Sequence, residues 1–128
     1  MRFKLPYLAI TIASLSASAV MAFPGDETYQ VCRNPTEPET FKISLVKVNS
    51  EYGMLVANNG RHKFNKGLVA GFGNQLIYTF KDVPMAASFS LESKELKIYK
   101  SDDLTAELWS GICQEFKLGA TEPAQLSR

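Results

Sequence analysis

Hydrophobic and polar residues alternate along most of the chain, in short runs separated by Gly, Pro, Asn, Asp and Ser. This period of two places successive side chains on opposite faces of a β-strand. The expected strands cover residues 29–32, 41–48, 52–57, 61–65, 75–80, 85–91 and 96–99. Neither a long helical period nor an internal repeat interrupts the pattern. The spacing therefore predicts an all-β domain, a small antiparallel barrel or sandwich of seven to eight short strands.

Two places in this pattern carry more specific signals. The Asn59-Gly60 pair lies between the strands expected over residues 52–57 and 61–65 and predicts a tight hairpin turn, because both residue types tolerate positive φ. Within residues 41–48, the apolar positions are odd-numbered up to Leu45 and even-numbered from Val46 onwards. This change of parity predicts either a β-bulge or a strand that is buried on both faces.

Two other stretches do not follow simple alternation. Residues 66–74 contain three glycines, which weaken a helix and a regular strand alike, so we expect a loop, a bulged strand or a sharp bend. Residues 104–116 fit either a short helix capped by Asp102 or Asp103, or strands. Because Gly111 would limit a helix to about two turns, we favour two short strands over residues 104–109 and 112–116.

The first 22 residues have the composition of a secretory signal peptide. A basic start with Arg2 and Lys4 precedes an apolar run over residues 5–20, and cleavage is expected after Ala22, with Ala19 as a competing position. The run is shorter than the roughly 20 residues of a membrane-spanning helix, so an uncleaved anchor is the less favoured alternative. We expect an exported protein, periplasmic or secreted, without stable membrane insertion once the signal is removed.

The chain after this leader has the size of one small domain. Residues 23–117 form the expected β-rich domain, and residues 118–128, with few large apolar side chains, form an expected flexible tail. Loss of Arg2 and Lys4 lowers the number of basic residues from 14 to 12, against 13 acidic residues. This near balance argues against a nucleic-acid partner and against an anionic lipid surface.

The chain has two cysteines, Cys32 and Cys113, near the two ends of the patterned region. In an exported protein two such cysteines are more often bridged than free, although two buried thiols are the alternative. A bridge that encloses about 80 residues would stabilise the fold by roughly 4–5 kcal/mol in the loop-entropy model. We therefore predict a Cys32–Cys113 disulfide that closes the domain.

The sequence shows no constellation of residues that indicates a specific reaction. His62 is the only histidine, and no serine or cysteine motif lies beside it, so a nucleophilic triad is not indicated. The residues show no metal-ligand spacing, and the glycines of residues 66–74 lack the Lys-Ser/Thr ending of a phosphate-binding loop. Paired carboxylates for glycoside hydrolysis stay open among 13 acidic residues. We expect no cofactor and no metal, and a small secreted hydrolase ranks last among the functions.

Binding fits the sequence better. Residues 66–74 combine an irregular pattern with apolar side chains, and recognition is commonly carried by loops held on a rigid sheet. The candidate binding residues are Lys66, Leu68, Val69, Phe72 and Tyr78. The alternative is that Leu68, Val69 and Phe72 plug one end of a barrel. We expect a non-enzymatic binding domain for a protein or a cell-envelope polymer, with a small-ligand carrier of β-barrel type as the second possibility.

The cysteines and their neighbours also carry a family resemblance. Tyr29 three positions before Cys32, a run of short strands and the closing Cys113 resemble the periplasmic inhibitors of C-type lysozyme. The resemblance implies a small disulfide-closed β-barrel that blocks the lysozyme cleft with loop residues. In that family these residues include a Ser-Gly-x-x-Tyr motif and a Thr-Lys-Gly motif.

This chain departs from both inhibitory motifs. Ser110 and Gly111 are not followed by the tyrosine of the first motif, and Lys66 is preceded by Asn65 rather than by threonine. The resemblance therefore supports the architecture, and inhibition is one member of the class of binding functions that we expect.

Overall fold

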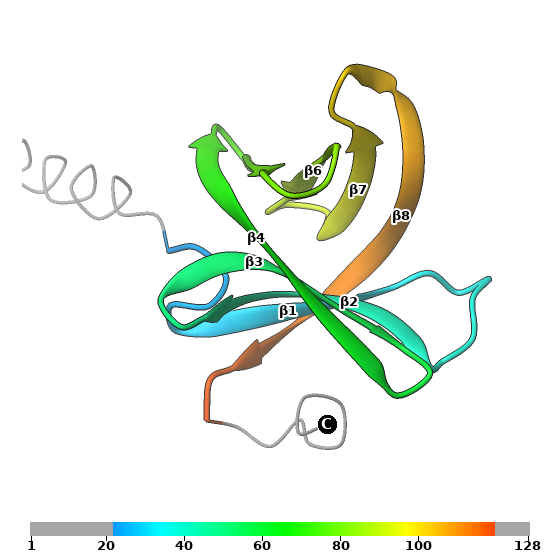
Figure 1. The fold of residues 1–128 in the computed structure, drawn as a ribbon. Helices are drawn as coiled ribbons and strands as arrows, with labels where there is room; N and C mark the ends of the chain where they lie inside the picture. The colour runs from blue at the N-terminus through cyan, green and yellow to red at the C-terminus, as the bar shows by residue number, and fades with distance from the viewer. Residues whose placement is uncertain (1–21, 120–128) are drawn as a thin grey trace, which may run out of the picture.

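The computed structural model describes residues 22–119, which form eight antiparallel β-strands (Figure 1). The strands are β1 Thr28–Arg33, β2 Phe41–Val48, β3 Glu51–Asn58, β4 Arg61–Phe72, β5 Gln75–Phe80, β6 Met85–Ser90, β7 Glu95–Lys100 and β8 Asp103–Lys117. Each strand pairs with the next and β8 pairs back with β1, so the sheet closes into a barrel. The predicted all-β fold with one disulfide is confirmed.

The described residues contain the expected domain, residues 23–117. The signal peptide expected over residues 1–22 lies outside them except for Ala22, and the tail expected over residues 118–128 lies outside them from residue 120 onwards. Within residues 22–119, no helix is long and apolar enough to cross a membrane.

Tight turns form where residues adopt positive φ. Asn59 and Gly60 have φ values of 55° and 87°, so the predicted hairpin turn between β3 and β4 is confirmed as type I′. Gly73, with a φ of 61°, opens the two-residue turn between β4 and β5. Asn49 and Ser50, with φ values of 52° and 69°, form the turn between β2 and β3 without a glycine.

Strand β2 is buried on both of its faces. Its pairing with β3 runs over the whole strand without a shift of register, so the change of parity after Leu45 is not a bulge. Ile43 and Leu45 belong to the main core, whereas Val46 belongs to a second apolar cluster that contains Tyr29 and Val31. Of the two structures predicted for this stretch, the strand buried on both faces is the one observed.

The two longest strands, β4 and β8, each change partner part way along their length (Figure 1). Strand β4 pairs with β3 up to Lys66 and with β5 from Gly67 onwards. Strand β8 pairs with β7 up to Ile112 and with β1 from the same residue onwards. The barrel therefore consists of two sheets that share these strands, a lower sheet of β8, β1, β2, β3 and β4 and an upper sheet of β4, β5, β6, β7 and β8.

Two predictions about these strands need correction. Residues 66–72 form neither the expected loop nor the bulged strand, because the chain continues β4 in unbroken register with β5 up to Phe72. The sharp bend, which was the third alternative, is confined to Gly73 and Asn74. Residues 104–116 form one continuous strand rather than two. The preference for strand over helix in residues 104–116 is confirmed.

The glycines at the two partner changes occupy sites that have no room for a side chain. A Cβ atom on Gly67 would lie 2.8 Å from the ring of Phe80. A Cβ atom on Gly111 would overlap the ring of Trp109 and lie 2.8 Å from the carbonyl oxygen of Arg33. Both glycines therefore mark close packing within a strand and not a break in it.

Large side chains fill the interior of the barrel. The largest fully buried hydrophobic side chains are Tyr78, Phe89, Leu45, Met54, Leu76 and Leu96. Cys32 and Cys113 face each other directly across β1 and β8 and form the predicted disulfide, which packs into the same core. The bridge fixes β8 to β1 one residue beyond the point where β8 changes partner.

Candidate binding cleft where strand β4 changes partner

The five candidate binding residues lie in different environments. Lys66, Leu68 and Phe72 are exposed on β4, and the exposed fractions of Leu68 and Phe72 are 69% and 65%. Val69 packs partly buried against the main core, and Tyr78 on β5 is fully buried within it. Leu68 and Phe72 therefore do not plug the barrel, and Tyr78 does not offer a surface contact.

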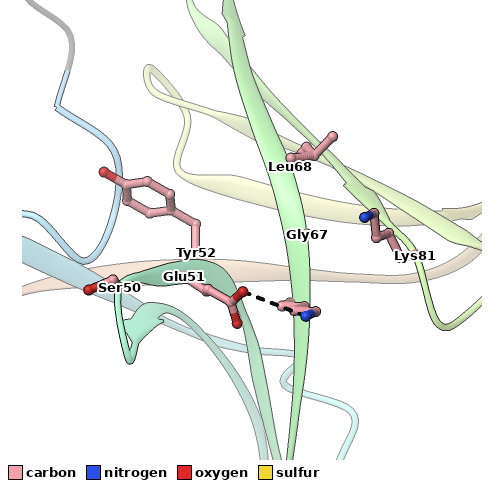
Figure 2. A pocket seen from close by; sticks show the side chains of 7 residues that line it. Ser50, Glu51, Tyr52, Gly67, Leu68 and Lys81 are labelled. Atoms are coloured by element: carbon pink, nitrogen blue, oxygen red, sulfur yellow. Dashed lines mark ion pairs between the residues drawn. The ribbon is translucent and has the colours of Figure 1, made fainter.

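A cleft of about 240 Å³ lies beside the middle of β4. Its lining residues are Ser50, Glu51, Tyr52, Lys66, Gly67, Leu68 and Lys81. Figure 2 shows Glu51 and Tyr52 on one side of β4 and Lys81 on the other. The cleft forms here because β3 and β5 pair with opposite edges of β4, so the two strands part where β4 passes from one to the other.

Two lysines give this cleft its charge. Nζ of Lys66 lies 3.6 Å from Oε2 of Glu51, and both side chains are about half exposed (Figure 2). An exposed pair of this kind contributes roughly 0–1 kcal/mol, so another carboxylate can replace Glu51 at little cost. Lys81 takes part in none of the ion pairs formed among residues 22–119. The cleft therefore carries one more positive than negative charge.

Tyr52 forms a fixed wall of the cleft. Its hydroxyl donates a hydrogen bond of 2.6 Å to Oδ1 of Asp26, which also accepts one of 3.3 Å from Nζ of Lys47. The bond from Tyr52 lowers the pKa of Asp26, and the same bond raises the pKa of Tyr52. The ring of Phe23 meets the Tyr52 ring edge-on at 5.5 Å and also packs against the main core. These contacts hold the phenol ring in place at the end of the barrel.

Tyr78 lies inside the barrel, with its ring stacked on that of Phe80 at 6.2 Å. Its hydroxyl is buried and has no hydrogen-bond partner among residues 22–119. Burial raises the pKa of Tyr78, and the nearby phenol of Tyr52 adds to this effect. Tyr78 is therefore a core residue with a neutral hydroxyl, and it is not placed to contact a bound molecule at the surface.

Titratable side chains do not gather into a metal centre in this part of the chain. Within residues 22–119, no three His, Cys, Asp or Glu side chains are placed to hold a metal ion. His62 is half-buried on β4, opposite Ala57 of β3. The chemistry of the cleft therefore rests on its two lysines, Glu51 and the side chains of Tyr52 and Leu68.

Of the residues that line the cleft, the sequence identified Lys66 and Leu68 but missed Tyr52 and Lys81. A signal for Tyr52 exists, because the two-residue turn at Asn59 and Gly60 sets the register of β3 on β4 and brings Tyr52 close to Lys66. Lys81 had no comparable signal, since its place depends on where β5 ends against the second half of β4. The turn between β3 and β4 thus predicts the side of the cleft that contains Tyr52. The side that contains Lys81 follows only from the pairing of β5 with β4.

We compared the chain with known protein families, curated proteins and solved structures. No family model, no curated protein and no solved structure matches the chain. The ligand chemistry of the cleft is therefore inferred from its own residues.

Proposed function

We propose that this protein is an exported, non-enzymatic binding domain that uses the cleft beside β4 to hold a carboxylate group of a protein or a cell-envelope polymer. The proposal rests on two lysines in the cleft, Lys66 and Lys81, and on the exposed Leu68 at its border. Lys66 is paired with Glu51, whereas Lys81 forms no ion pair among residues 22–119. The charge attracts a carboxylate, and the apolar border adds contact area.

Each part of the cleft has a role in this proposal. Lys81 supplies the charge that is not already neutralised within residues 22–119, and Lys66 can exchange Glu51 for a carboxylate of the partner. Leu68 is 69% exposed and offers apolar surface to the rest of the partner. Tyr52 keeps the cleft open because its hydrogen bond to Asp26 fixes the ring. A preformed site of this kind loses little conformational entropy on binding.

The two other function classes have less support. A small-ligand carrier needs space inside the barrel, but large side chains fully buried from solvent occupy that interior. A hydrolase needs a pair of placed carboxylates, and the cleft has only Glu51, which is paired with Lys66. Binding at the outer surface is the function that the geometry supports best.

Inhibition of an envelope hydrolase is one member of this class, as the resemblance to the lysozyme inhibitors implies. The active site of a glycosidase contains two carboxyl groups. A cleft with two lysines would be complementary in charge to such a site.

The test is capture of a partner from an envelope extract by the immobilised mature domain. We expect the domain to retain a partner, and Lys81→Glu to weaken this binding roughly tenfold, because it places a second carboxylate in the cleft. Lys63→Glu is the matched control, since Lys63 is exposed on β4 and does not line the cleft. Equal binding by the wild-type domain and Lys81→Glu would disprove a role for the cleft.

A further inference from the structure

One edge of β4 lacks a strand partner over half of its length. Residues 67–72 pair with β5 along one edge only. The pairing of β3 with β4 ends at Gly53 and Lys66, so the other edge of residues 67–72 pairs with no strand of residues 22–119. In Figure 1 this part of β4 extends beyond β3 as the outer limit of the upper sheet.

The hairpin between β4 and β5 determines which backbone groups point to the open edge. Phe72 and Gln75 flank a two-residue turn and therefore form a hydrogen-bonded pair. Since hydrogen-bonded and non-hydrogen-bonded pairs alternate along an antiparallel ladder, the even-numbered residues of this segment bond to β5. Gly67, Val69 and Gly71 then direct their N–H and C=O groups to the open edge.

This edge has none of the features that usually prevent strands from pairing with another molecule. Such features are charged side chains, proline and β-bulges. No charged residue and no proline occurs from Gly67 to Phe80, and the pairing of β4 with β5 is regular. Two large apolar side chains, Leu68 and Phe72, are exposed along the strand.

We propose that the open edge of residues 67–72 pairs antiparallel with the same edge of a second copy of this chain, with Ala70 opposite Ala70 of the second copy. In this register Leu68 of each copy lies opposite Phe72 of the other, and the two alanines between them leave room for the larger side chains. Val69 of each copy lies opposite Gly71 of the other, and their free N–H and C=O groups form the hydrogen bonds.

The charges along β4 also fit this register. Lys66 lies opposite Asn74 of the second copy, so no like charges face each other at the ends of the paired segment. A shift that places Val69 opposite Val69 of the second copy would set Lys66 against Phe72 and lose the apolar pairs. A second copy thus matches this strand in side-chain size and places no like charges opposite each other.

The inference goes beyond the proposed function, and the two can fail separately. Pairing at the edge depends on residues 67–72, and two of these, Gly67 and Leu68, also line the cleft. The charge that attracts a carboxylate comes from Lys66 and Lys81, which both lie outside this segment. A variant of Lys81 therefore tests the cleft alone, and a variant of Ala70, which does not line the cleft, tests the edge alone.

The first experiment is sedimentation velocity of the mature protein over a dilution series. We expect a dimer that dissociates on dilution. Ala70→Lys sets two lysines directly opposite each other and is expected to halve the molar mass, while the monomer stays folded because Ala70 is exposed. Thr79→Lys is the matched control, since Thr79 is exposed on β5, one strand inward from the edge, and should stay dimeric.

The second experiment tests the register. Ala70 and its counterpart would form a non-hydrogen-bonded pair with Cα atoms about 4.5 Å apart, which is within the range of a disulfide. Ala70→Cys should therefore form a covalent dimer that a reductant separates, and Thr79→Cys should not. A protein that stays monomeric at every concentration would overturn the proposal. A dimer that Ala70→Lys leaves intact, or an extended segment of a different protein on this edge, would overturn it too.

Discussion

Strands β4 and β8 occupy equivalent places in the barrel but have very different edges. Each passes from one sheet to the other, and each has a glycine packed under an aromatic ring at the change of partner. Each also has a segment that pairs with a strand of residues 22–119 on one edge only, residues 67–72 of β4 and 103–111 of β8. Both strands thus have an edge that could pair with another molecule, and only the edge of β8 is protected against such pairing.

Three features protect the first half of β8. Its pairing with β7 shifts register, and two acidic residues lie along it. The loop between β1 and β2 also contacts it, because Nδ2 of Asn34 donates a 2.9 Å hydrogen bond to the carbonyl oxygen of Ser110. Nε1 of Trp109 donates one of 3.3 Å to Oε1 of Glu37 in the same loop. Bulges, charges and a covering loop are known ways to keep a strand edge from pairing.

The second half of β4 has none of these features, and both of our proposals concern its surroundings. The absence of protection on β4 leaves a regular, uncharged edge and an adjacent cleft with two lysines. The difference leaves the edge of β4, and not that of β8, open for the recognition that we propose.

The largest expected effect concerns the disulfide between Cys32 and Cys113, which links β8 to β1. The disulfide fixes β8 to β1 beside its change of partner, whereas β4 has no such link. Replacing Cys32 and Cys113 by serine should lower the free energy of unfolding by roughly 4–5 kcal/mol, because the unfolded chain loses a closed loop of about 80 residues. Urea unfolding of the mature protein measures the loss.

Wild-type protein unfolded in the presence of a reductant is the control for the serine side chains, and it should reach the same reduced stability. A loss below about 1 kcal/mol would show that the closed loop contributes little. The closure on the β8 side would then depend on strand pairing alone, as it does on the β4 side.

A smaller effect is expected at the two glycines. Gly67→Ala and Gly111→Ala should each lower the free energy of unfolding by about 1–3 kcal/mol, because the added methyl group enters space held by an aromatic ring. Denaturant unfolding of both variants compares the two sites. Trp109→Leu in the Gly111→Ala background, and Phe80→Leu in the Gly67→Ala background, should reduce the cost of each alanine.

The double variants also separate the two mechanisms. Each alanine could lower the free energy of unfolding by the same amount with and without the aromatic ring. This result would show that contact with the ring is not the reason for glycine at that position. A cost at Gly111 alone would show that β4 is less tightly packed than β8 at its change of partner.

The sequence predicted the strands well where their signals are local. Alternation and turn residues located seven of the eight strands, although only the first half of β4, because a period of two and a positive φ depend on neighbouring residues. Strand β8 was expected as two short strands, with a helix as the alternative. Glycines within strands were misread as breaks, since the reason for Gly111 is the ring of Trp109, which the sequence pattern does not reveal. Lys66 was found from its neighbours, whereas Lys81 joins the cleft only through long-range pairing.

The smallest expected effect concerns the interior on the β4 side. Tyr78 lies on β5, opposite Val69 of β4. Its buried hydroxyl has no hydrogen-bond partner among residues 22–119. Tyr78→Phe removes this hydroxyl and should leave the free energy of unfolding unchanged or raise it by up to about 1 kcal/mol. Burial raises the pKa of Tyr78 above its ordinary value of 10, so the unfolded chain releases the proton at lower pH than the folded chain. Wild-type stability should therefore fall as the pH rises through 10, and Tyr78→Phe should lose this part of the fall.

Thermal unfolding of both proteins on either side of pH 10 measures the difference. Tyr99→Phe is the matched control for the removal of a tyrosine hydroxyl from a strand, since Tyr99 lies half-buried on β7. A loss of more than about 1 kcal/mol in Tyr78→Phe would show that the hydroxyl has a partner, such as a molecule held inside the barrel. That result would favour the carrier function over binding at the surface of β4. The binding site would then lie in the interior of the barrel and not on the outer face of the strand.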